Sequence, residues 1–240
     1  MAVYYYDDDE FGRMTVKTRV GLRRASFRWT GDRFSIMMPA EVADEATLRQ
    51  LIDRNREGMR RLAGRSQSVS YHVGQRIECF KCAVTIARQE KSPDLILLSY
   101  DDDPELRLSI PAGVEIDDYE AHVNVSIALQ AMMDHMALKR LIPHARRLAE
   151  QLGVHPRSIT IGRGLRKLGH CTQRGDIQLS RSVMFLPEPL ADYVIYHEFA
   201  HLTHFNHSAA FHALCNQYCQ GREKELAKTL RAFRWPVLRQ

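Results

Sequence analysis

Four histidines and one glutamate are concentrated between residues 197 and 207, in the sequence His-Glu-Phe-Ala-His-Leu-Thr-His-Phe-Asn-His. Side chains four residues apart share one face of an α-helix, so His197 and His201 can present two ring nitrogens to one metal ion. Glu198 is angled off that face and can reach a water on the metal without binding the metal itself. The spacing therefore predicts a catalytic zinc site with Glu198 as the general base.

A catalytic zinc ion takes three protein ligands and keeps one position open. His207 can be the third ligand if the chain turns after His201, and Asn206 would assist because asparagine tolerates the left-handed conformation that ends helices. His204 is the alternative, although on a continuing helix it would drift off the ligand face. We favour His207 and keep His204 as its rival.

Apolar neighbours indicate that this helix is buried, where histidines and a glutamate need polar partners that a metal ion can supply. These neighbours are Tyr193, Val194, Ile195, Phe199, Ala200 and Leu202. A hydrolase also needs a donor for the developing oxyanion, and His204, His170 and Tyr196 are candidates between which the sequence does not choose. Asp192 could steady a ligand histidine, but its place in the first helical turn also suits a simple helix-start carboxylate.

The chain has five cysteines, an odd number that suits reduced thiols and a cytoplasmic location better than a disulfide scaffold. Cys79 with Cys82, and Cys215 with Cys219, could together form a structural zinc site, but buried thiols are the simpler interpretation. Cys171 as a nucleophile is less attractive still, because a metal already accounts for the nearby chemistry.

The order of patterns predicts an α+β fold. Strand-like alternation covers 14–19, 25–29 and 34–39, with a turn signal at Gly31-Asp32, before an amphipathic helix over 43–63. Further strands follow from 68 to 109. Residues 119–152 predict a long helix divided at Pro143, and helices at about 188–203 and 209–233 follow two short strands at 158–161 and 175–179. We find no internal repeat, and we expect a strand-rich N-terminal region, 1–112, and a mainly helical catalytic region, 113–240.

Among the 240 residues, 45% are hydrophobic and 26% are charged, with a net charge of +5. No run approaches the ~20 apolar residues of a membrane-spanning helix, so we expect no membrane association. The positive charge permits contact with nucleic acid without requiring it. The second half is locally basic, and either a solvated helix face or a nucleic-acid-facing surface would explain its cations: Lys139, Arg140, Arg146, Arg147, Arg163, Arg166, Lys167 and Arg174.

The segment 193–202, Tyr-Val-Ile-Tyr-His-Glu-Phe-Ala-His-Leu, with Asn206, His207, Ser208 and Phe211 after it, resembles the YgjP-like metallopeptidase family, which is related to the SprT-like and WLM peptidases. Residues 168–179, Leu-Gly-His-Cys-Thr-Gln-Arg-Gly-Asp-Ile-Gln-Leu, resemble that family's W-G-S-C-s-x-x-G-x-I-x-L-N stretch. The resemblance covers about 119–233 well and the first half more loosely. It departs at Leu168 and His170, where Trp and Ser are usual, and at His212, where Trp is usual.

The resemblance implies a zincin-like core with His197, His201 and His207 as zinc ligands and Glu198 as the catalytic residue. The sequence thus favours a zinc peptidase acting on a peptide or protein substrate. Two alternatives are a protease acting on DNA- or RNA-bound proteins, and a non-catalytic zinc-binding interaction module. The presence of Glu198 argues against the last, because a purely structural site does not need it and usually closes the fourth position.

Overall fold

The computed structural model describes residues 2–29, 33–65, 69–90, 95–116, 119–164 and 167–238. The fold is α+β, as predicted, and the chain forms two compact units that divide between Val69 and Ser70. The division expected after residue 112 falls inside the second unit, between a strand and a helix. The turn expected at Gly31-Asp32 lies outside the described residues.

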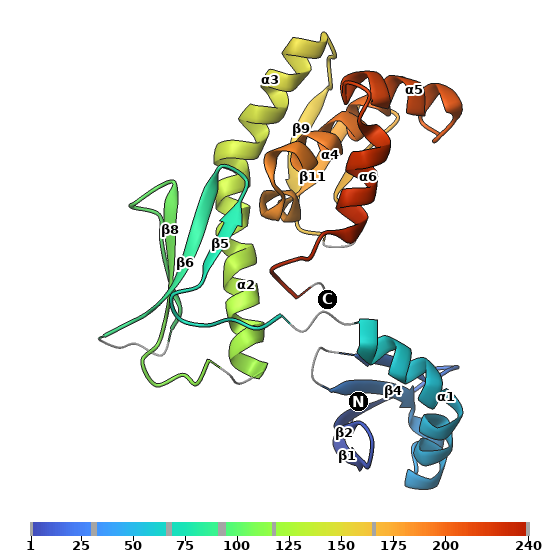
Figure 1. The fold of residues 1–240 in the computed structure, drawn as a ribbon. Coiled ribbons are helices and arrows are strands. Elements are labelled where there is room, and N and C mark those ends of the chain that lie inside the picture. The colour runs from blue at the N-terminus through green and yellow to red at the C-terminus, as the bar shows by residue number, and fades with distance from the viewer. Residues whose placement is uncertain are drawn as a thin grey trace. The chain divides into compact units, whose positions relative to one another are not determined.

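The first unit is a four-stranded sheet followed by one helix (Figure 1). Its elements are β1 (Val3–Asp8), β2 (Gly12–Arg19), β3 (Ser26–Trp29), β4 (Phe34–Pro39), a 3₁₀ turn (Ala40–Val42) and α1 (Glu45–Arg65). The strand order is β1-β2-β4-β3, in which β2 and β4 are parallel and the outer pairs are antiparallel. The sequence did not predict β1, because its run of three tyrosines followed by acidic residues lacks a clear apolar alternation.

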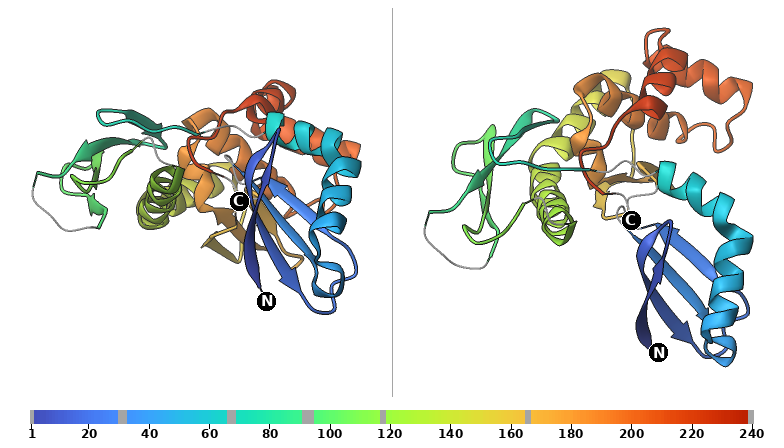
Figure 2. Two further views of the ribbon diagram at one scale, coloured as in Figure 1. Left: turned by 90° about the horizontal axis from the view of Figure 1, so that it is seen from below. Right: turned by 60° about the horizontal axis from the view of Figure 1, so that its bottom comes forward.

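One face of this sheet packs on α1, which lies along it in both views of Figure 2. Alternate strand residues point inward, as the period of two requires. The helix contributes Leu48, Ile52 and Met59, which recur at helical spacing. These side chains and the inward-facing strand residues Met14, Val16, Phe34, Ile36 and Met38 are at most 1% exposed. The opposite face of the sheet is not covered by α1.

The second unit begins with a sheet of the same topology. Its strands are β5 (Arg76–Cys79), β6 (Cys82–Arg88), β7 (Leu97–Ser99) and β8 (Glu105–Ile110), in the order β5-β6-β8-β7, again with the central pair parallel. A helix, α2 (Tyr119–Met136), follows here too. The sequence Pro-Ala-Glu-Val after β4 corresponds to Pro-Ala-Gly-Val after β8.

The two sheets therefore form an internal repeat, and the expectation of none is wrong. When Pro39 is aligned with Pro111, the buried residues of β2 and β4 coincide with buried residues of β6 and β8: Met14 with Val84, Val16 with Ile86, Phe34 with Leu106, Ile36 with Leu108 and Met38 with Ile110. The repeat lies in pairing and burial rather than in residue identity. Loops of different length conceal it in the sequence.

The long helix predicted over 119–152 is continuous but changes type in the middle. A π-helical segment, Ala137–Leu141, joins α2 to α3 (Ile142–Leu152) directly before Pro143, which lacks the amide that a regular helix uses. Gly153 ends α3 in the left-handed conformation, with a φ of 66°. Among the described helices, none is both long enough and apolar enough to cross a membrane.

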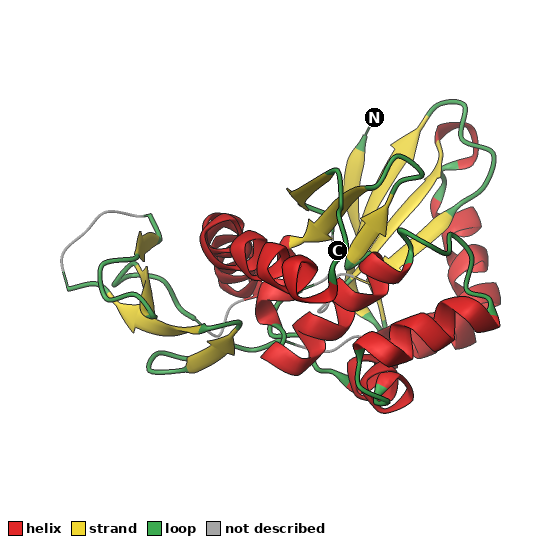
Figure 3. Ribbon diagram, turned by 90° about the horizontal axis from the view of Figure 1, so that it is seen from above, coloured by secondary structure: helices red, strands yellow, loops and turns green. Residues whose placement is uncertain are grey.

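The remaining elements, coloured from yellow to red in Figure 1, build the region that carries the histidines, and Figure 3 distinguishes the helices of the chain from its strands. Strands β9 (Ser158–Gly162), β10 (Gly169–Cys171) and β11 (Asp176–Ser180) form a sheet in the order β10-β11-β9, which leaves β10 at an edge. A 3₁₀ segment (Arg181–Phe185) leads to α4 (Glu188–Ala200), and α5 (Ala209–Tyr218) and α6 (Glu223–Ala232) follow. The single helix predicted over 209–233 is wrong, because Gln220 and Gly221 have φ angles of 54° and 85° that interrupt it.

Candidate metal centre

The helix α4 carries the first two histidines and ends before the third. Its interior is apolar, and Pro189 in its first turn suits a helix start, where the missing amide is not needed. The helix ends at Ala200, whose carbonyl accepts the amide of His204 at 2.9 Å as the chain turns away. Among the described non-glycine residues, positive φ angles occur at Lys81 and Gln220, so the expectation of a left-handed Asn206 is wrong.

The turn brings three histidine rings together. Each of His197, His201 and His207 offers a ring nitrogen, and these atoms all lie within 4.8 Å of one another. The Nε2 atoms of His207 and His197 are 3.1 Å apart, and the three ring centroids are 4.8 to 5.0 Å apart. Nitrogens that bind one zinc ion at ~2.0–2.1 Å need a comparable separation, so these residues fit the ion.

His204, the alternative third ligand, lies outside this group. Its backbone carbonyl is instead 3.0 Å from Nδ1 of His201. A hydrogen bond from Nδ1 fixes the ring and leaves Nε2 of His201 for a metal, which is the usual arrangement of a metal-binding histidine. The structure thus places His207 with the ring cluster and gives His204 a backbone contact.

A phenylalanine supports all three rings, a role that sequence reasoning did not predict. Phe211 of α5 is fully buried, and its ring centroid lies 4.5 to 4.9 Å from those of His197, His201 and His207. Ser208 begins α5, with its side chain accepting the amide of Phe211 at 3.4 Å. The first turn of α5 therefore positions the phenylalanine ring against which the three histidines pack.

Electrostatics favour neutral rings, the form in which histidine binds a metal. Burial lowers the pKa of His197 to about 4, with further contributions from His201, His207 and His212. Burial also lowers the pKa of His201, although its hydrogen bond with the His204 carbonyl opposes this effect. The cluster can therefore offer free ring nitrogens near neutral pH.

Glu198 lies beside the cluster in an apolar environment. It is 5% exposed, and no described residue donates a hydrogen bond to its carboxylate. Burial raises its pKa to about 7, with Lys167 acting in the opposite direction. Gly169 of β10 leaves room for this side chain, because a Cβ at that position would lie 2.3 Å from Oε1 of Glu198. The carboxylate thus lies between α4 and the edge strand without a hydrogen-bond partner among the described residues.

A pocket of about 290 Å³ opens next to these residues. His197 and Glu198 form part of its wall, together with Lys167, Leu168, Gly169, Tyr193, Val194 and Leu230. β10 therefore borders the pocket, and it pairs on only one side within its sheet.

His170 and Tyr196, two of the candidate oxyanion donors, lie in different environments. His170 is an exposed residue of β10, and its charge contributes to the lowered pKa of His201, so it lies near the ring cluster. Tyr196 instead packs against Tyr218 of α5, with ring centroids 6.3 Å apart.

Asp192 has a partner that the sequence did not predict. Its Oδ1 lies 2.5 Å from Nε2 of the buried His144, and its described hydrogen bonds include none with a ligand histidine. The other nitrogen of His144, Nδ1, lies 3.2 Å from Lys81 Nζ and 2.6 Å from Arg147 Nη2. Two cations at this nitrogen oppose a metal ion, although His144, Asp192 and Glu188 are close enough to hold one. The group instead links α3 to the start of α4.

The cysteines do not form a metal site. Cys79 and Cys82 face each other across the β5–β6 hairpin, and Cys215 and Cys219 are buried on and just after α5. No group of described residues able to hold a metal includes a cysteine, so the four-cysteine hypothesis is wrong. Burial, with the charges of Glu198 and Asp176, raises the pKa of Cys171 to about 11, which disfavours the nucleophilic thiolate.

Comparison with known proteins identifies the family of this chain. Residues 23–233 match the model of a family described as YgjP-like, metallopeptidase domain. No curated protein and no solved structure matches the chain significantly. The matched range contains the ring cluster, Glu198 and the edge strand β10. The chain therefore belongs to the YgjP-like metallopeptidase domain family.

Proposed function

We propose that this protein is a zinc-dependent peptidase in which His197, His201 and His207 hold the ion and Glu198 is the general base. One observation carries the proposal: three histidine nitrogens converge beside a buried carboxylate that no described residue engages. A zinc ion bound there would polarise the scissile carbonyl and lower the pKa of a water to about 7. Membership in a metallopeptidase family supports the same chemistry.

Glu198 has the position and freedom that a general base needs. It follows the first ligand directly, and its oxygens are not occupied by another donor of the described chain. In our scheme it accepts a proton from the attacking water as the oxygen adds to the carbonyl carbon. It then gives that proton to the departing amine nitrogen as the C–N bond breaks. A non-catalytic metal site would not need this carboxylate.

The surroundings of the pocket support an extended peptide as substrate. The free edge of β10 offers main-chain groups with which a peptide strand can pair. Among the candidate oxyanion donors, His170 has the best support because it belongs to this strand and lies near His201. His204 uses its carbonyl at His201, and Tyr196 packs on Tyr218. His170 would donate from an imidazole N–H to the developing oxyanion.

The substitution Glu198→Gln tests this function. Zinc content is measured on the purified wild type and variant, and cleavage is followed with unfolded, fluorescently labelled casein. We expect about one zinc ion per chain in both proteins and a cleavage rate about 10²- to 10⁴-fold lower in the variant. Glu57→Gln, at an exposed position of α1, is the matched control and should cleave like the wild type. Equal cleavage by Glu198→Gln, or a wild type without bound zinc, contradicts the proposal.

A further inference from the structure

Four of the eight cations that the sequence suggested as a nucleic-acid surface have contacts of their own, whereas Arg146, Lys167 and Arg174 make no ion pair or hydrogen bond with a described residue. Lys139 and Arg140 both bind Asp103, and Arg147 contacts His144. Arg163 lies 3.4 Å from Asp134, and Arg166 lies outside the described residues. These contacts favour local structural roles for Lys139, Arg140, Arg147 and Arg163.

The sheet of the first unit has a basic face directed away from α1, which we call the open face. It is formed by the alternate residues Val3, Tyr5, Asp7, Arg13, Thr15, Lys17, Arg19, Ser26, Arg28, Ser35 and Met37. The side chains of Lys17, Arg19 and Arg28 make no ion pair or hydrogen bond with any described residue. Tyr5 is 64% exposed. Three cations without an acidic partner among the described residues thus share this face with the exposed ring of Tyr5, over which Arg13 lies at 6.0 Å from the centroid.

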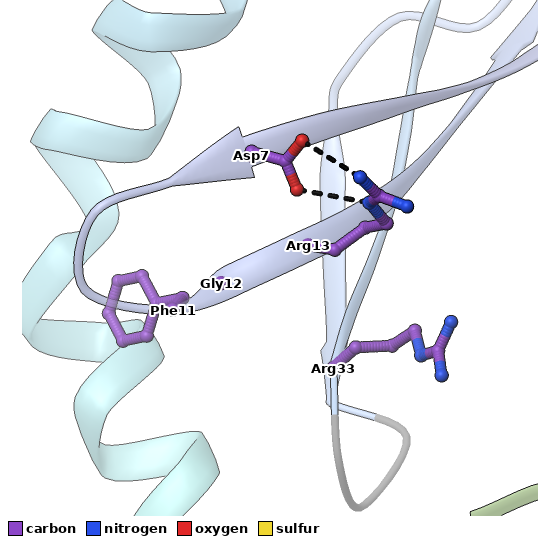
Figure 4. A pocket seen from close by; sticks show the side chains of 5 residues that line it. All are labelled: Asp7, Phe11, Gly12, Arg13 and Arg33. Atoms are coloured by element: carbon purple, nitrogen blue, oxygen red, sulfur yellow. Dashed lines mark hydrogen bonds and ion pairs between the residues drawn. The ribbon is translucent and has the colours of Figure 1, made fainter.

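Three acidic residues of this unit lie on the α1 side of the sheet. Asp8, Glu10 and Asp53 all bind Arg56 at the α1 side, at distances of 2.8 to 3.1 Å. On the open face, Asp7 pairs with Arg13 at 3.1 Å, as Figure 4 shows. In the same view the side chains of Arg13 and Arg33 point away from α1. With these three acids on the α1 side, Lys17, Arg19 and Arg28 leave a positive charge on the open face that no described acid balances.

The internal repeat provides a comparison within the same chain. On the equivalent face of the second sheet, Arg76 pairs with Glu105 at 2.7 Å and also contacts Glu78, and these two acids balance Arg76 and Arg107. The positions equivalent to Lys17, Arg19 and Arg28 are Ala87, Gln89 and Ser99, which are uncharged. The shared topology therefore does not require these three cations, and their charge has no counterpart in the second copy.

We propose that the open face binds single-stranded nucleic acid. Lys17, Arg19 and Arg28 would contact phosphates, and Tyr5 would stack on a base, as aromatic residues do on sheets that bind single strands. The hydroxyl groups of Thr15 and Ser35 lie between the cations and can hydrogen-bond to sugar or phosphate oxygens. Stacking requires unpaired bases, which favours single strands over duplex. RNA and single-stranded DNA share this chemistry.

The test uses the full chain and fluorescently labelled 20-nucleotide strands of mixed sequence, as DNA and as RNA, with anisotropy measured from 50 to 200 mM NaCl. The triple variant Lys17→Ala, Arg19→Gln, Arg28→Ser introduces the residues of the second copy. We expect it to bind at least tenfold more weakly at 50 mM NaCl. The slope of log Kobs against log salt should fall in magnitude by about 2, because each of three phosphate contacts contributes about 0.7.

Two further variants test the other contributions to binding. One removes the proposed base stacking, and the other removes positive charge away from the open face. Tyr5→Leu should lose about tenfold in affinity with an unchanged salt slope, because stacking releases no counterions. The control Arg54→Gln, Arg61→Gln, Lys224→Gln removes three exposed charges elsewhere and should change affinity less than threefold. Circular dichroism establishes that each variant is folded.

Several results would overturn the proposal. Absence of wild-type binding at 50 mM NaCl would do so, as would equal losses in the two triple variants. Equal affinity for a duplex of the same length would exclude stacking on unpaired bases, and equally tight binding of a poly-glutamate peptide would assign the face to acidic proteins. A preference between DNA and RNA would identify the natural strand. None of these measurements depends on the peptidase activity.

Discussion

The side chain of Glu198 occupies space that is free only because residue 169 is a glycine. The Oε1 atom of Glu198 would lie 2.3 Å from a Cβ at residue 169, and its Cγ atom would lie 2.5 Å away. Real Cβ atoms do not tolerate such contacts, so β10 and the carboxylate of α4 constrain each other. The edge strand that borders the pocket thereby also sets the position of the proposed general base.

Gly169→Ala should therefore reduce cleavage without removing the metal. The added methyl group must displace the Glu198 side chain, and we expect kcat/KM to fall about a hundredfold while zinc content stays at the wild-type value. The overpacked site should also lower the free energy of unfolding by about 1–3 kcal/mol. Gly164→Ala is the control, because a Cβ there has no atom within 4 Å. Wild-type kcat/KM in Gly169→Ala would mean that Glu198 need not hold this position.

His207→Ala and His204→Ala distinguish the two possible third ligands. His207 contributes its ring nitrogen to the cluster, whereas the described contact of His204 with His201 uses the backbone carbonyl, which alanine retains. We expect zinc affinity, measured by competition with a chelating dye, to fall more than about 100-fold in His207→Ala. It should fall less than threefold in His204→Ala. The opposite ranking would make His204 the ligand.

Asp192→Ala should destabilise the second unit. The substitution leaves Nε2 of the buried His144 without its partner, which costs about 1–3 kcal/mol. For a protein of this size, that cost lowers the Tm by about 2–10 °C. Differential scanning calorimetry of the variant measures this shift. Asp9→Ala, at an exposed position of the first unit, should leave the Tm within about 1 °C, and an equally small change in Asp192→Ala would show that the contact contributes little.

Acid should weaken the first unit through Asp8. Burial raises the pKa of Asp8, but hydrogen bonds from Arg56 and from the amides of Glu10 and Phe11 outweigh it and hold the pKa below its usual value. A carboxylate with a lowered folded pKa contributes stability above the unfolded pKa of about 3.9, and that contribution is lost as pH falls through the folded pKa.

Unfolding in urea at pH 7, 4 and 3 checks this dependence. Trp29 fluorescence reports the first unit when Trp235 is replaced by phenylalanine. Asp8→Asn should be less stable than the wild type at pH 7, and the difference should narrow toward pH 3. Asp9→Asn should follow the wild type throughout. A constant difference between Asp8→Asn and the wild type would contradict a role for ionisation.

The sequence predicted the elements whose apolar pattern is regular. β2, β4 and α1 have buried residues at periods of two and 3.6, and the helix from 119 to 152 changes type over Ala137–Leu141, shortly before Pro143. The division of the last helix was missed because a left-handed Gln220 depends on local packing rather than on residue type. The internal repeat was missed because it consists in the order in which the strands pair, which residue identities alone do not show.

For the site, local spacing predicted the convergence of His197 and His201 because both belong to one helix. The remaining relationships join separate segments. Phe211 contacts the rings from α5, Gly169 meets Glu198 from β10, and Asp192 reaches His144 on α3. No spacing in the chain encodes those distances. Gly169 belongs to the stretch 168–179 that carries the family resemblance, but nothing in that stretch indicates the carboxylate that the glycine accommodates.

The proximity of His197 and His207 has a further consequence for the chain between them. They are ten residues apart in sequence, yet their Nε2 atoms are 3.1 Å apart. An ion bound to both acts as a cross-link that closes a short loop over residues 198–206, and such a link removes conformational entropy from the unfolded chain. Metal occupancy would then control local order at the active-site turn. Amide exchange in residues 202–208 should quicken on chelation while the sheet of the first unit keeps its protection.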